Sequence, residues 1–276
     1  MTLDAHQHFW QFDPIRDAWI SENMGVLRRD FLPADLAPLL HQNGMDACVA
    51  VQADQSETET RFLLELAAQN NFIKAVVGWV DLRADDIERR LGYWSQFPLL
   101  RGFRHILQGE KPGFMLDPAF LRGIGALGKK GFTYDILVFP RHLRTVWQFL
   151  QNFENQKFIL DHIAKPYIRR GLIAQWKRDI RALSRHPNLW CKVSGLVTEA
   201  DWQGWKPGDF KPYLDVVFEA FGSERVVYGS DWPVCLLAAG YKEQKALLEN
   251  YLKTFSPTEQ AAFWGENGLK FYSIPS

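Results

Sequence analysis

Two histidines follow the first strand-like run of this sequence at a spacing that suits a shared ligand. His6 and His8 come directly after the apolar run Leu3–Ala5. Because side chains two residues apart point to the same face of a strand, both imidazoles are expected to reach one place. Paired imidazoles can bind one divalent cation, so the end of this run is a candidate metal or substrate site.

Two later runs end in residues of the same chemical kind. Asp161 and His162 lie near the end of the run 157–164, and Asp231 lies near the end of the run 225–233. A carboxylate beside imidazoles can take a proton from water, which is general-base catalysis of a hydrolysis. We therefore predict that Asp231 and His162 are catalytic residues.

The same side chains are candidate ligands for at most one divalent ion, such as Zn²⁺. Three imidazoles and a carboxylate make up this nitrogen and oxygen donor set: His6, His8, His162 and Asp231. Catalytic zinc normally has three protein ligands and an open position, so Asp231 is either a ligand or a free base. A metal-independent enzyme also stays open, in which His6 and His8 hydrogen-bond the substrate directly.

Further polar and aromatic side chains near the ends of such runs are predicted to bind a polar substrate. They are Trp10, Trp79, Arg104, Gln108, Tyr134 and Lys192. In the run 189–195, alternation with apolar neighbours leaves Lys192 either pointing inward or in a shifted register. His41, His142 and His186 lie on or beside helical segments, so we expect them at the surface or in packing contacts.

Eight short apolar runs recur along the chain and are predicted to be parallel β-strands. They are Leu3–Ala5, Ala47–Ala53, Ile73–Leu82, Leu99–Leu107, Phe132–Phe139, Lys157–Ala164, Leu189–Gly195 and Arg225–Pro233. Segments with apolar residues three or four positions apart lie between them and indicate amphipathic helices. From the second run onward the interval is about 25 to 37 residues, the size of one βαβ unit. We predict a single (β/α)₈ TIM barrel, an α/β fold, over residues 1–276.

A doubly wound open sheet is the alternative fold, because it also alternates strands and helices. It usually has fewer strands and a glycine-rich first turn, and the sequence contains no GxGxxG motif. Helix-start signals support the barrel boundaries: Ser56 with Glu59 for the second helix, and Asp209 for the seventh. In a barrel the carboxyl ends of all strands meet at one face, where active sites are built.

The first interval between strands is longer than the others and rich in aromatic residues. Residues Phe9–Pro33 include Trp10, Phe12 and Trp19. Long loops in compact domains are often functional lids, and the aromatic residues favour a packed one. We predict that Trp10 and Trp19 are buried against the top of the barrel.

Composition excludes several classes of protein. Of the 276 residues, 47% are hydrophobic and 23% are charged, which is typical of a globular chain. The formal net charge is zero, so neither nucleic acid nor an anionic membrane is an expected partner. No stretch is apolar enough to span a bilayer, and the three cysteines show no metal or disulfide spacing, which favours the reducing cytoplasm. A homo-oligomer stays open.

Five motifs together resemble the amidohydrolase superfamily, and more narrowly its aldonolactonase branch. They are HQHFW at 6–10, GFRHILQ at 102–108, LDHIAKP at 160–166, KVSGL at 192–196 and YGSDWPV at 228–234. That branch includes L-fuconolactonase and L-rhamnonolactonase and is related to 2-pyrone-4,6-dicarboxylate lactonase. The resemblance implies hydrolysis of a sugar lactone, L-fuconolactone or a similar aldonolactone, to the aldonic acid. It also implies that Asp231 activates water.

The sequence departs from the superfamily pattern at two strands. Metal-dependent members commonly use a histidine after strand 5, where this sequence has Tyr134 and Asp135. Binuclear members use a lysine or glutamate after strand 4, where this sequence has Arg104 and His105. A binuclear site is therefore not expected.

Three other functions stay open at this point. A non-oxidative decarboxylase of the same superfamily would need the strand 5 histidine. A lactonase for an anionic lactone would need several arginines at the mouth, and candidates are Arg16, Arg28, Arg29, Arg83, Arg104 and Arg141. A non-catalytic binding barrel would have no reason to gather three histidines and an aspartate at one face.

Overall fold

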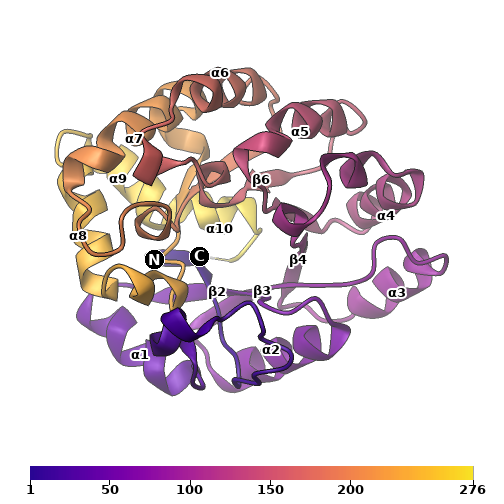
Figure 1. Cartoon of the computed structure of the whole chain (residues 1–276). Helices are drawn as coiled ribbons and strands as arrows, with labels where there is room; N and C mark the ends of the chain where they lie inside the picture. The colour runs from indigo at the N-terminus through magenta and orange to yellow at the C-terminus, as the bar shows by residue number, and fades with distance from the viewer. Residues whose placement is uncertain (276) are drawn as a thin grey trace.

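The eight apolar runs form eight strands of one parallel sheet in the computed structural model, which describes residues 1–275 (Figure 1). The strands are β1 Leu3–Gln7, β2 Ala47–Val51, β3 Ile73–Gly78, β4 Leu100–His105, β5 Thr133–Ile136, β6 Phe158–Leu160, β7 Leu189–Val193 and β8 Val226–Tyr228. They are ordered β1 to β8 as in the sequence, and each pairs with the next in parallel. The predicted (β/α)₈ barrel is confirmed.

The barrel closes between the end of β1 and the residues that follow β8. Gln7 and Trp232 form a parallel bridge. The His8 N–H donates to the Trp232 carbonyl at 2.7 Å, and the Asp231 N–H donates to the His6 carbonyl at 2.8 Å. The seam that closes the sheet is thus made by candidate site residues.

Helices surround the strands and supply the outer layer (Figure 1). They are α1 Pro33–Gln42, α2 Glu57–Gln69, α3 Ile87–Trp94, α4 Pro118–Lys129, α5 Leu143–Leu150, α6 Ala174–Leu183, α7 Pro207–Phe221, α8 Tyr241–Leu252, α9 Pro257–Ala261 and α10 Asn267–Phe271. Their apolar faces are buried as the spacing predicts; in α3 these are Ile87, Leu91 and Trp94. This burial against the strands holds most helices in place.

The helix-start predictions are half right. Ser56 caps α2, since its Oγ accepts the Glu59 N–H at 3.1 Å. Asp209 does not precede α7 but lies in its first turn, where its carboxylate accepts the Lys206 N–H at 2.8 Å. The prediction failed because Pro207 opens the helix two residues earlier, a position that proline favours.

The segment between β1 and α1 packs over the barrel, as predicted. Trp10 and Phe31 exchange two backbone hydrogen bonds of 3.0 and 2.9 Å, which fold the segment back on itself. Trp10 is only 3% exposed, and its Nε1 donates to the Arg29 carbonyl at 2.9 Å. Trp19 is 45% exposed, so its predicted burial is wrong: it contacts Trp10 edge-on but has solvent on its other side.

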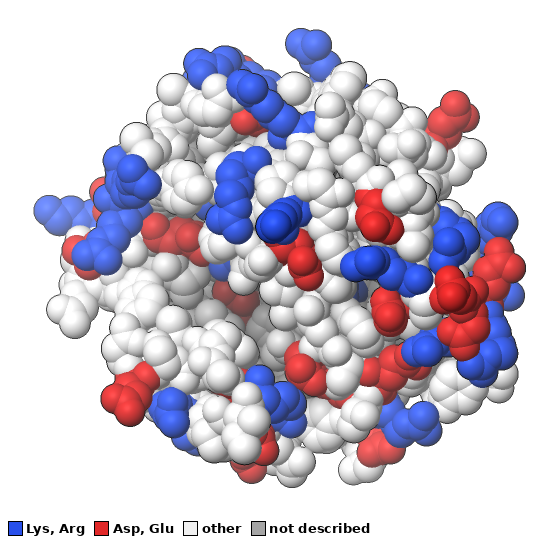
Figure 2. Space-filling view, turned by 45° about the vertical axis from the view of Figure 1, so that its right-hand side comes forward, with Lys and Arg blue, Asp and Glu red and all other residues white. Residues whose placement is uncertain are grey.

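Within residues 1–275 no helix has the length and apolar character that a membrane crossing requires. Basic and acidic side chains are interspersed on the face shown in Figure 2, without a continuous patch of either sign. This distribution agrees with the zero net charge of the sequence.

Replacing Trp10 with alanine is expected to destabilise the protein by about 3 kcal/mol, because a buried indole is removed and a cavity remains. Trp19→Ala, at a half-exposed position of the same segment, should cost less than about 1 kcal/mol. Urea unfolding of both variants measures the difference. Equal losses of stability would show that the segment is not anchored through Trp10.

Candidate active site

A cavity of about 220 Å³ opens at the carboxyl ends of the strands. It is lined by His8, Trp10, Trp19, Ala53, Arg104, Ile106, Gln108, Leu137, His162, Lys165, Asp231 and Val234. This is the face at which barrel enzymes build their active sites. The volume lies below the roughly 300–1,000 Å³ typical of sites for drug-sized ligands, so it suits a molecule about the size of a monosaccharide.

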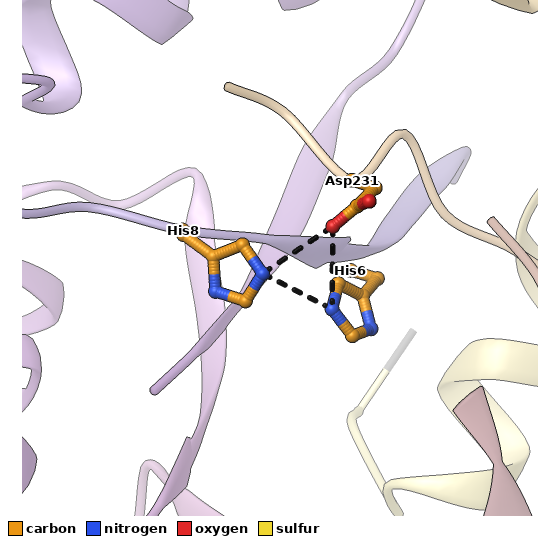
Figure 3. Close-up of side chains that lie close together, drawn as sticks. All are labelled: His6, His8 and Asp231. Atoms are coloured by element: carbon orange, nitrogen blue, oxygen red, sulfur yellow. Dashed lines mark hydrogen bonds and ion pairs between the residues drawn. The ribbon is translucent and has the colours of Figure 1, made fainter. Parts of the chain in front are cut away.

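His6, His8 and Asp231 converge on one point (Figure 3), and His8 and Asp231 line the cavity. The Nε2 atoms of the two histidines are 3.2 Å apart. Asp231 Oδ1 lies 3.4 Å from His8 Nε2 and 3.8 Å from His6 Nε2. His8 Nδ1 lies 2.7 Å from the Val51 carbonyl, so Nδ1 carries the proton and Nε2 presents its lone pair to the cavity.

A left-handed turn after β6 places His162 beside Asp231 and His6. The predicted strand 157–164 ends at Leu160, and residues 162–165 all have positive φ, between 48° and 61°. Non-glycine residues adopt this conformation at an energetic cost, and clusters of them mark functional sites. The turn is held by the Trp176 Nε1 donor on the Ile163 carbonyl at 2.9 Å.

The His162 imidazole is fixed on one side and free on the other. Its Nδ1 lies 2.8 Å from Ser194 Oγ, and its Nε2 lies 3.9 Å from Asp231 Oδ1. Gly195, with φ of 59°, passes so close that a Cβ there would lie 2.7 Å from His162 Nδ1. Only glycine fits this position on both counts.

Four charged side chains lie beneath these residues inside the barrel. Arg104 Nη1 donates to Asp161 Oδ2 at 3.1 Å, and Lys192 Nζ lies 2.8 Å from Asp135 and 2.9 Å from Asp161. Two cations therefore face two carboxylates, so the buried cluster has no net charge. Burial would raise the pKa of Asp161, but Lys192, His6 and Arg104 hold it well below its usual value.

Burial and neighbouring charges set the protonation of the site. Burial lowers the pKa values of His6 and His162 well below the usual value for histidine, so both imidazoles are neutral near pH 7. For Asp231, burial acts to raise the pKa, but His162, His8 and Lys165 lower it below its usual value. Asp231 is therefore ionised, and its Oδ2 has no hydrogen-bond partner among residues 1–275.

The donor atoms fit a single divalent ion. Ligands of a tetrahedral zinc with bonds near 2.1 Å are about 3.4 Å apart, close to the separations among His6 Nε2, His8 Nε2 and Asp231 Oδ1. Arg104 Nη1 lies 3.2 Å from His6 Nε2, so an ion bound there replaces that hydrogen bond. His162 belongs to a second group of potential ligands, with His6 and Asp161.

Three of the six residues predicted to bind substrate line the cavity, namely Trp10, Arg104 and Gln108. The other three, Trp79, Tyr134 and Lys192, do not line it. Lys192 points inward but is fully buried below the cavity floor. Tyr134 alternates with the inward-facing Asp135, so it faces the helices and packs against Phe120 and Phe149. Trp79 turns aside, and its Nε1 donates to His105 Nδ1 at 3.2 Å.

Lys165 lines the cavity but was missed as a substrate-binding candidate. Its Nζ donates to Glu199 Oε1 at 2.8 Å. Its place in the LDHIAKP motif was the available signal, but the left-handed turn that directs it inward has no sequence signature. His142 is buried and contacts the Glu110 carbonyl through Nε2 at 3.1 Å, which is a packing role as expected.

A buried carboxyl group fixes the loop after β2, which contributes Ala53 to the cavity. Glu59 accepts the Ala53 N–H at 3.1 Å and also accepts the Asp54 N–H. Burial raises the pKa of Glu59 from its ordinary 4.5 to about 8, although the two backbone hydrogen bonds act in the opposite direction.

Comparison with known proteins gives consistent matches over the whole chain. A family model described as amidohydrolase matches residues 3–274. An L-fucono-1,5-lactonase from Burkholderia multivorans is 42% identical over 100% of this chain and 97% of its own. A crystal structure of an amidohydrolase from Burkholderia multivorans with bound zinc has a TM-score of 0.96 at 42% identity, covering 100% of both chains. A probable 2-pyrone-4,6-dicarboxylic acid hydrolase from Acinetobacter baumannii shares the fold, with a TM-score of 0.81 at 15% identity over 99% of both chains.

The pKa of Glu59 leads to a prediction about stability. A carboxyl whose folded-state pKa is raised contributes stability that is present below pH 4.5 and is lost as the pH rises to about 8. Relative to Glu59→Gln, which cannot titrate, the wild type should lose a few kcal/mol of unfolding free energy between pH 5 and pH 8. Urea unfolding at several pH values measures this, with Glu65→Gln on the exposed face of α2 as the control. Parallel pH profiles for wild type and Glu59→Gln would contradict it.

Proposed function

This chain belongs to the amidohydrolase family, and from its site we propose that it opens a sugar lactone, L-fuconolactone or a similar aldonolactone, to the aldonic acid. The observation that carries the proposal is that Asp231 lies beside His6, His8 and His162 at a cavity of monosaccharide size, which Asp231, His8 and His162 line. The ionised Asp231 carboxylate, beside the neutral imidazoles of His6 and His162, can activate water for hydrolysis.

Asp231 is the general base in this proposal. Its Oδ1 faces the imidazoles, while Oδ2 is buried without a hydrogen-bond partner in the described chain and is available for a proton. Asp231 takes a proton from water as the water oxygen bonds to the carbonyl carbon. The bond from that carbon to the ring oxygen then breaks, and the proton passes to the ring oxygen, which becomes the hydroxyl of the aldonic acid.

The histidines orient and polarise the lactone carbonyl. A divalent ion such as Zn²⁺ would be held by His6, His8 and Asp231 and would supply Lewis acidity toward that carbonyl. His162, neutral and anchored by Ser194, presents Nε2 beside the same point. Its imidazole stabilises the negative charge that develops on the carbonyl oxygen.

The charges around the cavity favour a neutral lactone over an anionic one. Arg104 and Lys165 are the two permanent cations that line the cavity among residues 1–275. Each is already paired, Arg104 with Asp161 at 3.1 Å and Lys165 with Glu199 at 2.8 Å. Binding a carboxylate substrate would require breaking one of these ion pairs. A sugar hydroxyl can instead hydrogen-bond to Arg104 or Lys165 while the ion pair stays formed.

We also place the enzyme in the cytoplasm and expect no nucleic-acid partner. The three cysteines are free and buried, which suits a reducing compartment. The zero net charge gives no electrostatic attraction to a polyanion.

Asp231→Asn should lower kcat for lactone hydrolysis by roughly 10² to 10⁴-fold, because the nearly isosteric amide cannot accept the proton. A pH-indicator assay measures the rate, and circular dichroism checks the fold. Asp85→Asn, an exposed carboxylate before α3, is the control and should keep full activity. Activity of Asp231→Asn within about tenfold of the wild type would remove Asp231 from the mechanism.

Substrate charge can be tested with matched neutral and anionic lactones in the same assay. We expect kcat/KM to be at least about 10-fold higher for neutral sugar lactones, because each cation that lines the cavity is paired. A preference for lactones that carry a carboxylate would contradict this reading of the cavity.

A further inference from the structure

A chain of buried contacts runs from the C-terminal segment through the barrel interior to His6. We infer that Tyr272 is a positioning residue for His6, acting through Asp135 and Lys192. The inference rests on the proposed function, in which His6 belongs to the catalytic site. It assigns a role in the chemistry to a residue at the opposite end of the barrel from the cavity.

The C-terminal segment fills the barrel at the amino ends of its strands. Leu269, Phe271, Tyr272 and Ile274 form one apolar cluster with inward-facing side chains of the strands. At Gly265, just before α10, a Cβ would lie 2.2 Å from the Met1 carbonyl oxygen, so this segment passes close to the start of β1. Figure 1 shows α10 lying across the middle of the ring of strands.

The first contact joins Tyr272 to Asp135 of β5. The Tyr272 hydroxyl donates to Asp135 Oδ2 at 2.7 Å, and both side chains are buried. Asp135 Oδ1 has no hydrogen-bond partner within the described part of the chain. The carboxylate is therefore held through Oδ2 alone, by Tyr272 and by one other residue, Lys192.

The second contact joins Asp135 to Lys192 of β7. The ammonium lies 2.8 Å from Asp135 Oδ2, 2.9 Å from Asp161 Oδ1 and 5.5 Å from the centre of the Tyr272 ring. The lysine side chain is flexible, and a fully buried ammonium is stable only beside its carboxylate partners. The position of Asp135 thus helps to decide where along the barrel axis the Lys192 charge lies.

The third contact joins Lys192 to His6. Its Nζ lies 3.1 Å from His6 Nδ1 and 2.9 Å from Asp161 Oδ1, and that oxygen lies 3.4 Å from the same nitrogen. Because an ammonium only donates, an ion on Nε2 leaves the Nδ1–H facing Asp161 Oδ1, the acceptor that Lys192 holds in place. The opposite nitrogen, Nε2, faces His8 and Asp231 at the cavity floor. Partners of the outer nitrogen fix the orientation and proton position of a site histidine, and their loss typically costs 10- to 100-fold in metal affinity or activity.

Tyr272→Phe tests the inference, because it removes the hydroxyl and leaves the ring packed against Phe271. We expect kcat for lactone hydrolysis to fall about 10-fold with KM within about twofold, and the Kd for zinc to rise about 10-fold. The matched control is Tyr213→Phe on α7, also a buried tyrosine but one whose hydroxyl has no partner among residues 1–275. It should change neither quantity.

Calorimetry measures the Kd for zinc on folded protein. Because Kd does not depend on the fraction of protein that is folded, a higher Kd shows a mispositioned His6 and not a loss of folded enzyme. A double-mutant cycle adds a second readout: in an Asp135→Asn background, Tyr272→Phe should have no further effect on Kd. Unchanged kcat and Kd in Tyr272→Phe, or an effect that persists fully in the Asp135→Asn background, would overturn the inference. Absence of lactone hydrolysis by the wild type would overturn the proposed function instead and leave the zinc readout standing.

Discussion

The closure of the barrel between β1 and the residues after β8 is the constraint on which the rest of the site depends. Two backbone hydrogen bonds, from His8 to Trp232 and from Asp231 to the His6 carbonyl, join the first and last strands. The same residues carry the imidazoles and the carboxylate. A parallel barrel closes only when its first and last strands are joined. The short segments that join them here also bring the donor atoms together.

The second constraint is electrostatic: charges buried inside the barrel must be paired. A barrel interior normally holds apolar layers, yet here Arg104, Lys192, Asp135 and Asp161 occupy it. Unpaired charges there would be strongly destabilising, and the cluster is tolerated because two cations face two carboxylates. Because Arg104 is already paired with Asp161, it is not a free cation, and the cavity offers two imidazoles, His8 and His162, and the Asp231 carboxylate to a substrate.

Much of this arrangement could be predicted from sequence, because it follows from strand periodicity. Eight runs with βαβ spacing indicate the barrel, and the carboxyl ends of its strands place His6, His8, His162 and Asp231 together. Sequence did not predict the placement of residues where the backbone leaves the strand pattern. It also did not predict it where the in-and-out alternation of side chains along a strand was not applied. No local signal marks the left-handed turn that directs Lys165 inward, and the outward placement of Tyr134 follows only once Asp135 is fixed as an inward residue.

We propose that the seam gathers one ion site from His6, His8 and Asp231 at the point where the lactone is opened. The most direct test combines elemental analysis of the purified protein with lactone hydrolysis before and after chelation. We expect one divalent ion per chain, loss of hydrolysis on chelation and its recovery with one equivalent of zinc. Two ions per chain, or full hydrolysis by metal-free protein, would contradict it.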